Sequence, residues 1–187
     1  PFSIIAVIGL TNSFNMIDGL DGLAASMGIT ATIGILFSNP TIDFFIFNNI
    51  VFAVASGLIP FLIFNITSLY RLKVFLGDGG SLFLGFVVCW ALIYNAENSN
   101  HFSPTLALWC VSVPLFDFFA VIILRKFEKR SLFIANKDHI HHFLQNLGFS
   151  KVVILILITI VSLIMLSVGF FIEEKFTQLS FPIYIFL

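Results

Sequence analysis

Long runs of apolar residues, separated by short polar breaks, constrain the fold of this chain more than any other feature. A helix that crosses a bilayer needs about 17–25 mainly apolar residues, and an open strand in lipid leaves its backbone unpaired. The sequence therefore predicts an all-α, polytopic transmembrane bundle with about five full spans and two partial spans at the chain ends. The runs cover residues 1–10, 23–38, 44–64, 81–95, 104–124, 152–172 and 179–187.

Composition supports a membrane protein and excludes a soluble globular domain. Apolar residues make up 59% of the 187 residues and charged residues 10%, whereas soluble domains average about 25% charged. A net charge of −1 gives no field that would attract nucleic acid, so no nucleic-acid partner is expected. Two cysteines inside apolar runs, Cys89 and Cys110, do not make a disulfide framework and are expected to pack or face lipid.

The polar breaks predict the orientation of the bundle. If every run spans, residues 11–22, 65–80 and 125–151 share one side of the membrane. Eight of the nine Lys and Arg residues fall on that side, and only Lys175 falls on the other. The positive-inside bias makes the first side cytoplasmic. Trp90, Tyr94 and Trp109 are then expected near the outer interface, where amphipathic rings are favoured.

The first cytoplasmic break contains hard oxygen-bearing side chains three residues apart: Asn12, Asn15, Asp18 and Asp21. Residues at this spacing rotate by about 60° around a helix, so their side chains can converge on one broad face. Gly19 and Gly22 permit a tight turn beside them. Such ligands suit a divalent cation and a phosphate. For Asp21, capping of a helix that begins near Leu23 is an equally good interpretation.

The second cytoplasmic break contains "GDGGS", in which Asp78 lies between Gly77 and Gly79. Ser81 is expected to cap the helix that follows, and the uncovered backbone N–H groups can bind an anion at that helix N-terminus. Asp78 would repel the anion unless a metal ion lay between them. The alternative interpretation is an ordinary turn between helices.

The third cytoplasmic break contains His139, His141 and His142, close to lysines. Their spacing does not fit a zinc site, so contact with phosphate or sugar oxygens is favoured, with surface histidines as the alternative. Asp117 lies inside an apolar run near its cytoplasmic end. Because a carboxylate is costly in the membrane, it is expected to face the bundle interior, a partner or the site.

Three motifs, "NSFNMIDGLDGLA", "FLGDGGS" and "HIHH", resemble signatures of the polyprenyl-phosphate N-acetylhexosamine-1-phosphate transferases, the WecA/MraY family, and the form of the first and last resembles the WecA branch. The resemblance implies transfer of N-acetylhexosamine-1-phosphate, with N-acetylglucosamine favoured, from a UDP-sugar to undecaprenyl phosphate. The products are a lipid diphosphosugar, which initiates a cell-envelope polysaccharide, and UMP. It also implies a multi-pass protein of the bacterial inner membrane, a cytoplasmic active site, contact with membrane lipid, a requirement for Mg²⁺ or Mn²⁺, and a possible homodimer.

The resemblance assigns roles to the motif residues. The expected catalytic residues are Asp18, Asp21, Asp78, His139, His141 and His142. The expected substrate-binding residues are Asn12, Asn15, Gly77, Gly79, Asp117, Arg125 and Lys137. The expected metal ligands are Asp78, Asn15 and Asp18.

The chain departs from the family pattern in two places. The family's adjacent Asp-Asp pair is missing from this sequence, and two prolines expected before the histidines are replaced in 131–133 and 135–137. Together with half-length runs at both ends, the missing pair predicts that residues 1–187 are the C-terminal portion of a longer single membrane domain. An inactive family remnant and a transporter or channel fragment remain the alternative interpretations.

The charge bias generates a test of topology. Single cysteine probes at Asn136 and Asn98, in a cysteine-free background, are expected to react with an impermeant thiol reagent from opposite faces of the membrane, because Lys and Arg concentrate on one side. Labelling of both probes from the outer face would contradict the assignment.

Overall fold

A computed structural model describes residues 2–38, 45–67, 70–99, 102–129 and 138–186 of the chain. The described residues form eight α-helices and one 3-10 turn and contain no strand, which confirms the predicted all-α class. The elements are α1 (Phe2–Ile17), α2 (Leu23–Ser38), α3 (Phe45–Ile66), η2 (Tyr70–Leu72), α4 (Gly77–Asn98), α5 (Pro104–Cys110), α6 (Ser112–Phe127), α7 (Ile140–Asn146) and α8 (Lys151–Phe186).

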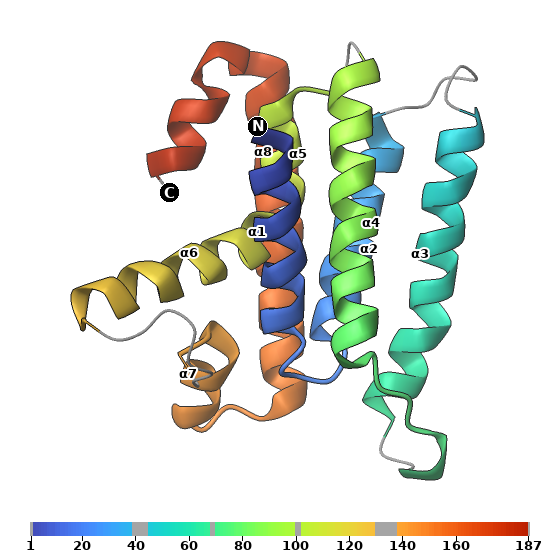
Figure 1. Ribbon diagram of the computed structural model, residues 1–187, viewed down its shortest axis with the longest axis vertical. Coiled ribbons are helices and arrows are strands. Elements are labelled where there is room, and N and C mark those ends of the chain that lie inside the picture. Colours follow the sequence, from blue (N-terminus) through green and yellow to red (C-terminus); the bar gives the residue numbers. More distant parts are fainter. Residues whose placement is uncertain (1, 39–44, 68–69, 100–101, 130–137, 187) are drawn as a thin grey trace.

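Several of these helices can cross a membrane. Within the described ranges, α3, α4 and α8 are each long and apolar enough to span, whereas α1 and α2 are apolar but have 16 residues each. Figure 1 shows α1, α2, α3, α4 and the main part of α8 running side by side along the long axis. The chain is therefore a helical bundle of the membrane-embedded kind.

The apolar run 104–124 was predicted as one straight span, and this detail is wrong. Its helices α5 and α6 are bent by 82° at Val111. Pro114 has no N–H to donate to the carbonyl of Cys110 four residues earlier, so the helix loses a hydrogen bond at this point, which favours a break. In Figure 1, α6 leaves the bundle sideways.

The C-terminal part of the chain breaks within the predicted stretch, but more sharply than expected. The break 173–178 and the short run 179–187 were expected as a loop and a separate partial span. The helix α8 is interrupted by a kink at Phe176, whose φ of −143° and ψ of 49° are not helical, and a second helical part follows it to Phe186. Figure 1 shows the chain folding back beside the bundle after this kink. Residues 177–186 are called the return segment below.

The aromatic residues that were expected near the outer interface divide into two groups. Trp90 and Tyr94 are partly exposed, as expected for interface residues, and their rings pack with Phe47. Trp109, which was also expected at the interface, is fully buried against α8 and the return segment, so that prediction is wrong. Both cysteines are buried packing residues.

The close contact between α1 and α4 depends on Gly85. A Cβ built at Gly85 would lie 2.9 Å from the Cα of Thr11 and 2.9 Å from the Cβ of Phe14. Small residues at such crossings let membrane helices approach closely. As a result, the C-terminal end of α1 and the N-terminal end of α4 meet at the lower end of the bundle. Loop 18–22 and α7 lie at the same end in Figure 1, as the alternating breaks predicted.

The crossing at Gly85 generates a stability prediction. Gly85→Ala is expected to force α1 and α4 apart, because the nearest obstacle is the backbone of Thr11. Overpacking of this kind costs about 1–3 kcal/mol, which corresponds to a fall in Tm of about 3–10 °C for a chain of this size.

The matched control is Gly57→Ala on α3, where nothing lies within 4 Å of the added Cβ. Thermal unfolding of both variants in detergent provides the measurement. Equal midpoints for the two variants would contradict the proposed role of Gly85.

Candidate functional site

The first loop, residues 18–22, joins α1 to α2 and carries two of the predicted carboxylates. α1 ends at Ile17, so Asn15 lies in its last turn and Asp18 follows it directly. Gly22 has a φ of +82°, a conformation that favours glycine, and it makes the tight turn that the sequence predicted. Asn12 does not join this cluster, because it is exposed and its amide donates back to the carbonyl of Ile8.

The glycine-rich turn, residues 77–81, meets the end of α1. The amide of Asn15 donates to Oδ1 of Asp78 at 3.4 Å and to Oγ of Ser81 at 2.9 Å. The Ser81 hydroxyl in turn donates to the carbonyl of Asp78 at 3.2 Å. One side chain of the first motif thereby orients the carboxylate of the second, across 63 residues of sequence.

Ser81 was predicted to cap the helix after the glycines, and this prediction is wrong. α4 begins four residues earlier, at Gly77, whose φ of +66° favours glycine, and the residue before it provides no side-chain cap. Gly77, Asp78 and Gly79 are exposed. The first N–H groups of α4 therefore lack a side-chain cap at the lower end, and the positive end of the helix dipole favours an anion there.

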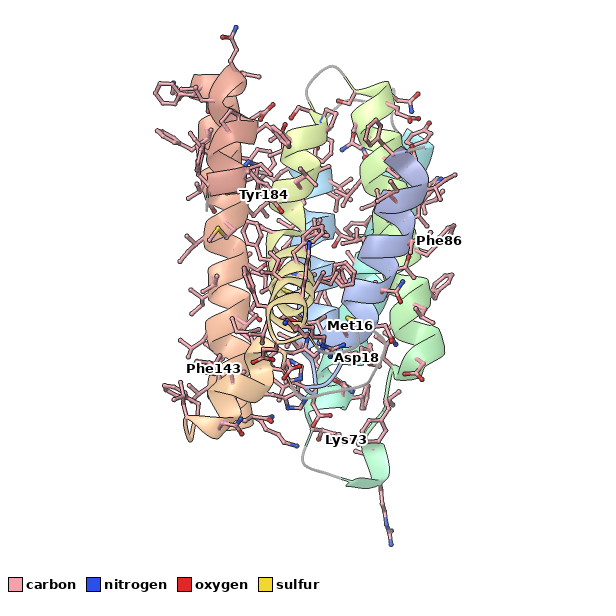
Figure 2. All side chains as sticks on the ribbon, turned by 60° about the vertical axis from the view of Figure 1, so that its left-hand side comes forward. Met16, Asp18, Lys73, Phe86, Phe143 and Tyr184 are labelled. Carbon is pink, nitrogen blue, oxygen red and sulfur yellow. The ribbon has the colours of Figure 1, made fainter. Side chains whose placement is uncertain are left out.

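Negative charge is concentrated between the two loops. Burial raises the pKa of Asp18 to about 6, and the nearby carboxylates of Asp78 and Asp21 add to the shift. Asp21 is itself paired with Lys73, whose Nζ lies 2.7 Å from its Oδ2. Figure 2 shows Asp18 and Lys73 together at the lower end of the bundle. Asp18 and Asp78 thus form an acidic pair that a cation would stabilise.

The acidic pair fits Mg²⁺ better than a metal that needs a full protein cage. Among the described residues, no group of three His, Cys, Asp or Glu side chains is arranged to hold a metal ion. Mg²⁺ is usually bound by one or two carboxylates, with substrate phosphates and water as its other ligands. Asp18 and Asp78, with the amide oxygen of Asn15 near them, supply that kind of donor set.

The histidine segment, residues 139–142, is held in place by α6. Oδ2 of Asp117 lies 2.8 Å from Nδ1 of His139, and its Oδ1 accepts the backbone N–H of Ile140 at 2.8 Å. Nearby, Nε of Arg125 lies 3.4 Å from Oδ2 of Asp138. Asp117 and Arg125 are both buried, as expected for charged groups that face inward. Lys137, a predicted substrate contact, lies outside the described residues.

His141 connects the histidine segment to the first loop. Its side chain is fully buried and lies directly against Gly19, where any Cβ would overlap its Nε2. Among the residues that the structure describes, neither ring nitrogen of His141 has a hydrogen-bond partner. Burial, with smaller contributions from the neighbouring His142 and His139, lowers the pKa of His141 to about 4, although the Asp117 carboxylate opposes the shift. His141 is therefore a neutral imidazole at pH 7, and its Nε2 lies against Gly19 of the first loop.

Two residues that sequence reasoning missed complete the site. Lys73 neutralises Asp21, as described above. Asn65, at the end of α3, is buried; its Oδ1 accepts the N–H of Gly22, and its Nδ2 donates to the carbonyl of Val74 at 2.7 Å. Asn65 therefore ties the first loop to the segment that leads into the glycine-rich turn. A polar residue near the end of an apolar run was the only sequence signal for it.

Comparison with known proteins identifies the family. Residues 1–96 match the model of glycosyl transferase family 4, which is just over half of the 187 residues. The chain belongs to glycosyl transferase family 4. The matched residues include the first loop and the glycine-rich turn, and the match confirms the predicted family.

Curated relatives in this family extend the similarity over most of the chain. The undecaprenyl-phosphate alpha-N-acetylglucosaminyl 1-phosphate transferase of Escherichia coli (strain K12) is 34% identical over 172 residues, which cover 89% of this chain and 46% of the relative. The protein of the same name from Yersinia pestis is 32% identical over the same length. A "probable undecaprenyl-phosphate N-acetylglucosaminyl 1-phosphate transferase" of Bacillus subtilis (strain 168) is 34% identical over 154 residues, or 80% of this chain and 41% of the relative. This glycosyl transferase family 4 chain thus spans less than half the length of these relatives.

Burial of neutral His141 generates a pH prediction. Its folded pKa of about 4 lies below the ordinary value of 6.5, so between these values the unfolded chain binds more protons than the folded chain. Stability is therefore expected to fall as the pH is lowered from about 6.5 towards 4. In His141→Asn this contribution should be absent.

The measurement is the difference in Tm between the unsubstituted chain and His141→Asn at several pH values, because other titrating groups cancel in the difference. Phe143→Leu, an exposed position on the same helix α7, is the control. A difference in Tm that does not change between pH 4 and 7 would contradict a buried neutral His141.

Proposed function

We propose that this chain carries the site of a phosphotransferase that moves N-acetylglucosamine-1-phosphate from a UDP-sugar to undecaprenyl phosphate. The apposition of Asp18 and Asp78, from two loops at one end of a membrane bundle, carries the proposal. One substrate is a lipid phosphate and the other a water-soluble nucleotide, so the reaction needs a site at the boundary between lipid and water. The names of the relatives support the lipid acceptor and the sugar.

The reaction forms one phosphorus–oxygen bond and breaks another. An oxygen of the lipid phosphate attacks the phosphorus that bears the sugar, and the bond from that phosphorus to the bridging oxygen breaks. UMP leaves, and the lipid retains a diphosphate joined to the sugar. Such transfers depend on positioning and on neutralising charge more than on covalent chemistry with the protein.

The residues of the site suit these requirements. Asp18 and Asp78 would hold Mg²⁺ or Mn²⁺, which would neutralise charge on the phosphates when bound. Asn15 fixes the orientation of Asp78 through a hydrogen bond. The uncapped N-terminus of α4, at Gly77 and Gly79, suits a phosphate oxygen. Neutral His141 can donate or accept a hydrogen bond beside the first loop.

The position of the charged groups argues against a transporter or channel fragment. Such a protein would need polar groups along a path through the bundle. Here Asp18 lies in the loop after α1 and Asp78 in the first turn of α4, while Asp117 and Arg125 of α6 contact residues 138–140 at the start of the histidine segment. We propose that the end of the bundle with these loops faces the cytoplasm of a bacterial inner membrane, because it carries most of the Lys and Arg residues. A homodimer remains part of the proposal.

The proposal predicts loss of transfer in Asp78→Asn, which retains the size of the side chain but removes its charge. Release of UMP from UDP-N-acetylglucosamine, with undecaprenyl phosphate and varied Mg²⁺, is expected to fall by about 100-fold or more. The assay uses the chain alone and, in parallel, the chain co-expressed with any upstream segment encoded in frame with it.

The control is Glu97→Gln, the same acid-to-amide change at the opposite end of the same helix, where the side chain is exposed. Its UMP release should equal that of the unsubstituted protein. Normal transfer by Asp78→Asn would remove Asp78 from the site. Absence of transfer in every form would favour an inactive remnant.

A further inference from the structure

The elbow between α5 and α6 is a sharp bend on which the histidine segment depends. Pro114 accounts for a break near Val111, but a proline does not by itself fix the angle between the two helices, which is 82°. Asp117 lies six residues beyond the break, or about 9 Å along α6 at 1.5 Å per residue. A change of about 20° in the bend would move Asp117 by about 3 Å, enough to break its contacts with His139 and Ile140.

The return segment touches both arms of this elbow. Ser180 and Tyr184 are one helical turn apart, so they share a face, and both are buried. The indole N–H of Trp109, on α5, donates to Oγ of Ser180 at 3.3 Å. The ring of Tyr184 packs edge-on against Trp109, with centroids 5.1 Å apart, and stacks on Phe116 of α6, with centroids 4.9 Å apart. One tyrosine ring therefore contacts a residue on each side of the bend.

Trp109 is also enclosed from the other side. Gly169, on the main part of α8, is in such close contact with Trp109 that any Cβ there would overlap the indole. The indole thus lies between the rising part of α8 and its return segment and is fully buried. Phe116, the next ring in this stack, immediately precedes Asp117. The packing therefore forms a continuous path from the return segment to the residue that holds the histidine segment.

We propose that the return segment sets the bend of the α5–α6 elbow and so positions Asp117 and the histidine segment for the reaction. Tyr184 and Ser180 are positioning residues that do not touch the substrates. Figure 2 shows Tyr184 in the upper half of the bundle, well away from Asp18 at the lower end. The catalytic consequence rests on the function proposed above, whereas the effect on the bend does not.

The first measurement follows the bend directly. Spin labels on Lys126→Cys, near the tip of α6, and Ile164→Cys, on α8, report the distance between the two helices by pulsed electron paramagnetic resonance; both sites are exposed, and the native cysteines are buried. Tyr184→Leu is expected to broaden or shift the distance distribution. Tyr184→Phe should leave the distribution unchanged, because the Tyr184 hydroxyl has no hydrogen-bond partner among the described residues.

The matched control is Phe186→Leu, the same loss of an aromatic ring in the same segment at a position that is 90% exposed. If Tyr184→Leu does not fold, Phe116→Leu removes the stack from the other side and answers the same question. A distance distribution in Tyr184→Leu equal to that of Phe186→Leu would overturn the proposal.

The second measurement is transfer. Tyr184→Leu is expected to lower kcat by about 10- to 100-fold, with little change in the KM for the UDP-sugar, and Tyr184→Phe should restore kcat. A changed bend with normal kcat would overturn the link to catalysis. If the unsubstituted protein shows no transfer, the proposed function fails, while the distance measurement still decides whether the return segment sets the bend.

Discussion

The close approach of α1 and α4 is the constraint on which the rest of the site depends. Gly85 allows the backbones of the two helices to approach closely, and the end of α1 then places Asn15 within hydrogen-bond distance of Asp78 and Ser81. The carboxylates of Asp18 and Asp78, which come from two loops far apart in sequence, therefore lie near each other. Burial raises the pKa of Asp18, and repulsion from the nearby carboxylates of Asp78 and Asp21 adds to this effect. A cation bound between the two loops would relieve that repulsion.

The remaining elements act as supports around this pair. Asn65 links the first loop to Val74, in the segment that leads into α4. Lys73 neutralises the Asp21 carboxylate through an ion pair, so Asp18 and Asp78 are the carboxylates that could bind a ligand. On the opposite side, Asp117 holds the backbone and ring of the histidine segment. The first loop is thus tied down both by a buried polar side chain, Asn65, and by its own buried apolar residue Leu20.

Much of the fold and the site could be predicted from the sequence, for identifiable physical reasons. Apolar run length and charge bias report directly on the membrane, so the helical class and the shared end of the three motifs were predictable. The bend at Val111 was missed because the run 104–124 was identified by its apolar composition, which takes no account of a single proline. Pro114 itself indicates a break in a helix. The burial of Trp109 and the partners of Lys73 and Asn65 were not predictable, because they depend on which faces of distant helices meet.

His141 has a consequence for how the protein is made. The imidazole that rests on Gly19 comes 122 residues after it in the chain (141 − 19), beyond α2 to α6. During synthesis on the ribosome, α1 and α4 can pair in the bilayer while the first loop still lacks this neighbour. The contact between Gly19 and His141 can form only after α2 to α6 have been synthesised, so a protein arrested before α7 would have the first loop and the glycine-rich turn but not this contact.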